Sequence, residues 1–142
     1  MSQSYKTIHE FSALQLSQSL LNVNNANTAI TLDPSYSGEI IMLNATSGSA
    51  VTLPAPQAGL SYTFIVNATG GHTITAPSAS IQGSVTASIG TIGSTLLTTG
   101  APKTVVSTTA GSVVGDEIRL VASANRYFVR GGVANFNALV FA

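Results

Sequence analysis

The fold class is set by the segment Leu60-Ser61-Tyr62-Thr63-Phe64-Ile65-Val66. Its even-numbered residues are all large and mostly apolar, and in an extended chain they would point to one side. The odd-numbered positions include two hydroxyl residues and would point to the other side. This alternation is typical of a strand that buries one face.

The same period of two recurs at residues 85–89, 117–120 and 127–129. β-Branched residues are abundant, and Gly or Pro recurs at short intervals through the middle of the chain. Many short strands with frequent turns predict an all-β fold, a β-sandwich or jelly-roll-like domain of short antiparallel strands. A chain of 142 residues suits one domain, which we place at residues 26–142, after an N-terminal arm at residues 1–25.

An internal repeat relates residues 43–54 to residues 66–77, which are identical at six of twelve positions with an offset of 23. Each copy has the pattern of a strand, a turn that begins with Asn, a second strand and a proline exit. We therefore expect two successive hairpins, in which the glycines at 70–71 supply the positive φ of a tight turn. Two copies are fewer than the roughly three that a solenoid needs.

Two further turns can be placed from the sequence. Residues 123–125 are expected to join strands at 117–122 and 126–130, with Asn125 in the left-handed conformation. The Asn-rich residues 22–27 predict a loop between the arm and the first strand.

Charge is unusually scarce in this chain. Only 7% of residues are Asp, Glu, Lys or Arg, against about 25% in ordinary domains. None of them lies between Ile40 and Pro102, so the chain has no basic track for phosphates, and nucleic acid is not an expected partner. An almost uncharged surface can meet another protein without desolvating many ions, which favours assembly.

Residues for catalysis or metal binding are also scarce. The chain has no Cys and only two histidines, His9 in the arm and His72 beside two glycines. Asp116 and Glu117 are neighbours at the start of a strand, so their side chains should point to opposite faces and cannot form a catalytic carboxylate pair. Glu117 would face solvent and could pair with Arg119, Arg126 or Arg130. We expect no enzymatic activity, no metal ion and no cofactor.

Membrane insertion is not expected, because the longest apolar runs, such as residues 40–43, are far too short to span a bilayer. The polar residues 1–10 lack the apolar core of a signal peptide. A glycan site would need an exposed aromatic platform, for which Tyr36 and Tyr127 are the candidates. Tyr62 lies on the apolar face of its strand, where core packing is expected.

Several segments together resemble small structural domains of tailed bacteriophages, found in capsid decoration (cement) proteins and in head- or tail-fibre knobs. The resemblance spans residues 38–131 and depends on strand endings and glycine turns. It implies a β-sandwich or jelly roll that is commonly trimeric. The chain departs from many of these domains in having Tyr127 in place of Trp. The segments that carry the resemblance are residues 51–54, 58–59, 64–67, 73–75, 81–83, 115–120 and 127–131.

Between the two roles, the absence of a fibre shaft favours the decoration protein. The resemblance then implies a homotrimer on the outer capsid surface of a virion, with the major capsid protein as partner. Its role would be to stabilise the assembled shell. The alternative is a trimeric fibre tip that binds a receptor or glycan.

The arm is the expected contact with the capsid and within the trimer. Its apolar residues fit neither a helical nor an alternating pattern, and their surface needs a partner. The residues of this predicted interface are Tyr5, Ile8, Phe11, Leu14 and Leu16.

Overall fold

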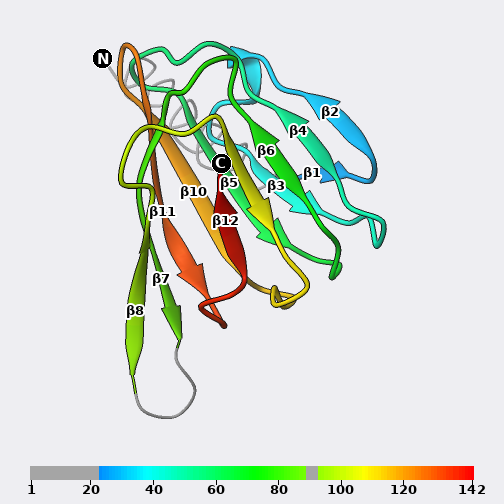
Figure 1. The fold of residues 1–142 in the computed structure, drawn as a ribbon. Helices are drawn as coiled ribbons and strands as arrows, with labels where there is room; N and C mark the ends of the chain where they lie inside the picture. The colour runs from blue at the N-terminus through cyan, green and yellow to red at the C-terminus, as the bar shows by residue number, and fades with distance from the viewer. Residues whose placement is uncertain (1–22, 89–92) are drawn as a thin grey trace, which may run out of the picture.

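The computed structural model describes residues 23–88 and 93–142, and within them twelve strands form two facing sheets (Figure 1). Sheet A has seven strands in the order β1 (Val23–Ala26), β3 (Ile40–Leu43), β5 (Ser61–Val66), β10 (Glu117–Ala122), β11 (Tyr127–Val133), β7 (Ile81–Ser88) and β8 (Ser94–Thr98). Sheet B has five strands in the order β12 (Leu139–Phe141), β9 (Val105–Thr108), β6 (Thr73–Thr75), β4 (Ala50–Thr52) and β2 (Ala29–Thr31). The predicted all-β sandwich is confirmed.

The sheets are mixed, whereas the sequence suggested antiparallel strands throughout. β1, β3 and β5 are parallel to one another in sheet A, and β2, β4 and β6 are parallel in sheet B. The chain therefore crosses from one sheet to the other at each step along β1–β6. The first half of the domain is a stack of three strand–turn–strand arches, each of which contributes one strand to each sheet.

This topology overturns the two hairpins predicted from the repeat. The two strands of each copy lie in different sheets, and each pairs with its equivalent in the next copy, as in the row Ala29, Ala50 and Thr73. The two strands of an arch enter different sheets with a turn of six residues at 44–49 and 67–72 and with a turn of two at 27–28. Neither Gly70 nor Gly71 has the positive φ predicted for a hairpin turn.

A third copy of the repeat precedes the two that the sequence displays. Ala26, Leu43 and Val66 are aligned in the register of the parallel strands. Each is followed by an asparagine, which is Asn27, Asn44 or Asn67. The Asn67 side chain donates to the Asn44 side chain at 2.7 Å. Asparagines at equivalent positions of stacked parallel strands form bonds of this kind. The copy was hidden because its turn between β1 and β2 has only two residues, 27–28.

The Asn-rich loop predicted at residues 22–27 is also wrong, because β1 occupies Val23–Ala26. The sheet thus begins before residue 26, where we placed the start of the domain. Residues 1–22 of the predicted arm lie outside the described residues.

The second half of the domain closes this stack with mostly antiparallel pairing. β10 and β11 form the predicted hairpin, although among the described residues only glycines have a positive φ, so Asn125 is not left-handed. β10 pairs antiparallel with β5, and β9 pairs antiparallel with β6. Each sheet thus gains one antiparallel strand beside the last arch. β7 and β8 form a ribbon that extends beyond the body of the sandwich (Figure 1).

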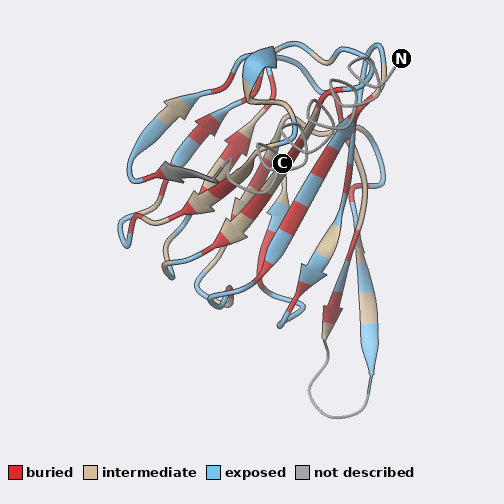
Figure 2. Ribbon diagram, turned by 180° about the vertical axis from the view of Figure 1, so that it is seen from behind, coloured by how far each residue is buried: buried red, intermediate tan, exposed pale blue. Residues whose placement is uncertain are grey.

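One continuous core fills the space between the sheets. Burial alternates with exposure along the strands, most regularly along β10 (Figure 2). Two buried tyrosines lie side by side in the core, Tyr62 and Tyr127, with ring centroids 6.3 Å apart. The Tyr62 hydroxyl donates to the Asp33 carbonyl at 3.1 Å, and that of Tyr127 to the Pro54 carbonyl at 3.0 Å. Each hydroxyl from sheet A thus binds the chain where it leaves a strand of sheet B.

Candidate interaction surfaces

The two sheets end together at one side of the sandwich in a groove of about 400 Å³, whose lining mixes apolar side chains with Thr98, Thr99 and Lys103. Its walls are β8 and β12, and among the described residues each of these strands pairs with a single neighbouring strand. Leu96 is 61% exposed and Val140 is 51% exposed, while Phe141 packs partly against the core. Unpaired strand edges with large exposed apolar side chains are typical of surfaces that meet another chain.

A second hollow, of about 470 Å³, lies between the β7–β8 ribbon and the loop before β10. Buried Asp116 stands at its base, where its Oδ2 accepts from Val113 N–H at 2.9 Å and its Oδ1 from Ala134 N–H at 2.7 Å. Both carboxylate oxygens therefore accept hydrogen bonds from the backbone and link the loop before β10 to the end of β11. Glu117 is exposed on the outer face of sheet A, so the predicted separation of the two carboxylates is confirmed.

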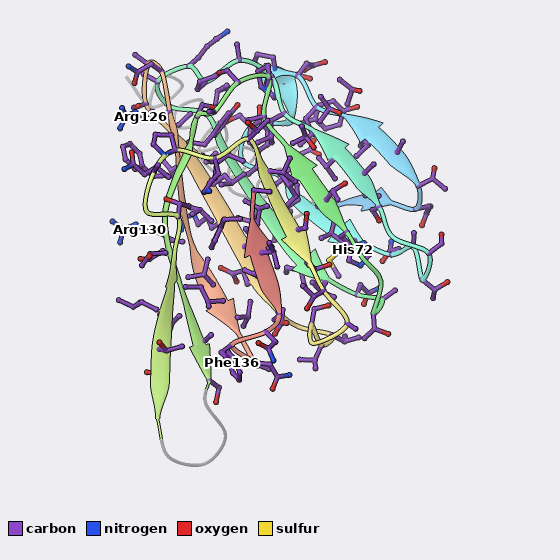
Figure 3. The ribbon with its side chains drawn as sticks, in the orientation of Figure 1. His72, Arg126, Arg130 and Phe136 are labelled. Atoms are coloured by element: carbon purple, nitrogen blue, oxygen red, sulfur yellow. The ribbon has the colours of Figure 1, made fainter. Side chains whose placement is uncertain are left out.

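His72 is wholly buried in the turn of the third arch (Figure 3). Its Nδ1 accepts from Ser49 N–H at 2.9 Å, so the ring proton lies on Nε2, which donates to the Ala68 carbonyl at 2.6 Å. Its backbone N–H donates to Thr108 Oγ1 at 2.8 Å, and that hydroxyl donates to the Gly70 carbonyl. Both ring nitrogens thus have partners within the fold. His72 joins two arches to the end of β9.

Ser49 occupies the equivalent position in the second arch and also forms a hydrogen bond to the preceding arch. Ser49 precedes β4 as His72 precedes β6, and its hydroxyl donates to the Ala26 carbonyl of the first arch at 2.6 Å. Each turn therefore bonds to the arch before it. Ser49 and His72 are 23 residues apart, which is the offset of the repeat. This spacing is the feature of the sequence that could have indicated a structural role for His72.

The two tyrosines proposed as a glycan platform do not form one. Tyr127 is wholly buried, which contradicts the prediction that it is exposed, because its hydroxyl finds a buried carbonyl partner and its ring can join the core. Tyr36 is half-buried on the short 3-10 helix η1 (Pro34–Tyr36) and packs against the core.

Burial changes the pKa of the two buried tyrosines, whereas hydrogen bonds change that of the η1 cap, Asp33. Burial raises the pKa of Tyr62 and of Tyr127 above the ordinary value of a phenol, which favours the neutral form of both hydroxyls. Asp33, the cap of η1, accepts from the Ser35 hydroxyl at 2.5 Å and the Ser35 N–H at 2.7 Å, and these bonds lower its pKa.

The predicted arm interface, from Tyr5 to Leu16, lies outside the described residues. Within residues 23–88 and 93–142, no three His, Asp or Glu side chains are grouped as ligands of a metal ion. In the same ranges there is no helix with the length and apolar character that a membrane span requires. Comparison with protein-family models, curated proteins and solved structures finds no match to this chain.

Proposed function

We propose that this chain is a non-enzymatic structural protein of a phage virion, a capsid decoration (cement) protein that binds the outer surface of the assembled shell as a homotrimer. The observation that carries the proposal is the groove between β8 and β12, strands that each have one edge unpaired by the described residues. It lies on a domain with very little charge and with the sequence features that resemble such proteins.

The groove is suited to a contact between copies. Its residues Leu96 and Val140 are 61% and 51% exposed, and burying the remaining area against a neighbour would contribute roughly 1–2 kcal/mol each. A contact between this edge and a different surface of the next copy closes into a ring at three, the number that the resemblance implies. Three copies of one capsid contact then act together, so avidity compensates for weak individual contacts. Binding only the assembled shell would stabilise it by mass action.

The oligomeric state tests the groove directly. We expect the purified chain to be a trimer in light scattering coupled to gel filtration at micromolar concentration, and Leu96→Asp to convert it to a folded monomer. Val114→Asp is the matched control, because Val114 has the same 61% exposure but lies outside the groove. A wild-type monomer, or a trimer that tolerates Leu96→Asp, would contradict the assigned interface.

Attachment to shells tests the function itself. We expect the trimer to add stoichiometrically to mature capsids that lack it, and the bound protein to raise their melting temperature. A variant without residues 1–16 should still fold as a trimer but should no longer attach, because we propose that Tyr5, Ile8, Phe11, Leu14 and Leu16 contact the capsid. Equal binding by the truncated chain would place the contact elsewhere. Failure of the intact trimer to bind any shell would refute the decoration role.

A further inference from the structure

The outer face of sheet A gathers most of the positive charge of this chain. Lys and Arg number five in the whole sequence, and three of them, Arg119, Arg126 and Arg130, lie on the β10–β11 hairpin. All three are exposed, and Figure 3 shows Arg126 and Arg130 on the same outer side of the sheet. In a chain with so little charge, this concentration on one hairpin distinguishes the face from the rest of the described surface.

Arg119 and Arg130 are directly opposite each other in the register of β10 and β11. Like charges at such a pair repel and cost stability. Glu117 lies two residues from Arg119 on the same face, but among the described residues no ion pair joins it to either arginine. The free domain therefore carries two opposed arginines, neither of which forms an ion pair with a described residue.

The next row of the same face supplies an apolar centre. Val121 and Phe128 are opposite each other, and Phe128 is 44% exposed. Gln82 follows Phe128 in the register, and its Oε1 accepts from Arg126 Nη1 at 2.5 Å. Arg126 is thus held at one side of the apolar pair, while Arg119 and Arg130 lie on the other. We call these five residues, Arg119, Val121, Arg126, Phe128 and Arg130, the arginine face.

We infer that the arginine face docks an acidic protein surface, one that presents an apolar side chain between carboxylates. The guanidinium fork matches a carboxylate with two parallel hydrogen bonds, and two adjacent arginines can hold two carboxylates. A buried aromatic centre within a charged rim is the usual arrangement of a protein interface. Three cations with a neighbouring Glu117 are too few for a phosphate track, so a protein is favoured over nucleic acid. This inference goes beyond the proposed function, because it requires neither a capsid nor a trimer.

The probe for this docking is a fluorescein-labelled peptide with a central Phe flanked on each side by two Glu residues. We expect fluorescence anisotropy to show saturable binding that weakens as salt is raised. Arg119→Gln with Arg130→Gln should weaken binding at least about tenfold, and Phe128→Ser by a similar factor. Lys103→Gln is the control, because Lys103 carries the same charge but lines the β8–β12 groove. A peptide with Gln in place of Glu should not bind.

Thermal melting supplies the second readout. Because removing one of two opposed charges relieves repulsion, Arg130→Gln should melt at or above the wild-type temperature, so lost binding would not reflect lost folding. The inference is overturned if the Glu peptide does not bind at millimolar concentration, or if Lys103→Gln weakens it as much as the arginine variants. Tighter binding of a single-stranded oligonucleotide through the same arginines would overturn it in favour of nucleic acid.

Discussion

Replacement of Gly131 by alanine is expected to destabilise the domain by roughly 3–5 kcal/mol. Gly131 has a φ of +149°, a conformation that residues with a Cβ rarely adopt. A Cβ at this position would overlap the carbonyl oxygen of Glu117 in β10 and lie 3.2 Å from the Cα of Ile118. Both atoms belong to the backbone of the neighbouring strand, so the overlap can be relieved only by disrupting the β10–β11 ladder.

Gly132→Ala is the matched control for this substitution. Gly132 is the next residue of β11, its φ is not positive, and an added Cβ would meet nothing within 4 Å. Its replacement should change the free energy of unfolding by no more than about 0.5 kcal/mol. Urea unfolding followed by circular dichroism measures both variants. Similar midpoints for the two variants would show that β10 and β11 are not as close as the structure places them.

The alternation of apolar and polar residues was enough to find the strands and the sandwich. It located β5 and β10 closely but only the second half of β7, and the short turn at residues 123–125 correctly indicated an antiparallel hairpin. Alternation reports which side of a strand is buried, but it does not report which strand lies beside it. The parallel pairing of β1, β3 and β5 was therefore not predictable from the period of two.

The repeat could have revealed the arches. A turn of six residues, as at 44–49 and 67–72, is longer than the two-residue turns of the tightest hairpins. The first copy escaped because its turn is four residues shorter than that of the second copy, and β3 is two residues shorter than β5. Asn27 therefore lies 17 residues before Asn44, whereas Asn44 lies 23 before Asn67. Alignment on the apolar–Thr pairs of β2, β4 and β6 would have recovered it.

The surfaces depend on register, which is why the sequence did not locate them. Arg119 and Arg130 are eleven residues apart, and only the hairpin pairing brings them directly opposite each other. The groove likewise lies between β8 and β12, which are edge strands of different sheets. The prediction for Tyr127 failed for a simpler reason. Large apolar residues occupy both sets of alternate positions in β11, so either set could be buried. The structure buries Tyr127 and exposes Phe128.

Loss of the His72 side chain should strongly destabilise the arch stack. His72→Ala would leave Ser49 N–H without its acceptor and the Ala68 carbonyl without its donor. A buried group left unsatisfied costs about 1–3 kcal/mol, and the vacated ring volume adds a further penalty. We expect a total loss of about 3–5 kcal/mol in the free energy of unfolding. Thr69→Ala, at an exposed position of the same turn, should lose less than about 0.5 kcal/mol.

Two further substitutions separate hydrogen bonding from packing at His72. His72→Phe fills the volume but restores neither bond, so it should remain at least about 2 kcal/mol less stable than wild type. His72→Gln offers one acceptor and one donor, and it should be the most stable of the three variants. Denaturant unfolding of the four chains gives the order. If His72→Phe matched or exceeded His72→Gln, the ring would serve the core by its volume, and the bonds between successive arches would contribute little. If the order is Gln, then Phe, then Ala, the hydrogen bonds of His72 to Ser49 and Ala68 stabilise the stack of arches beyond the volume of the ring.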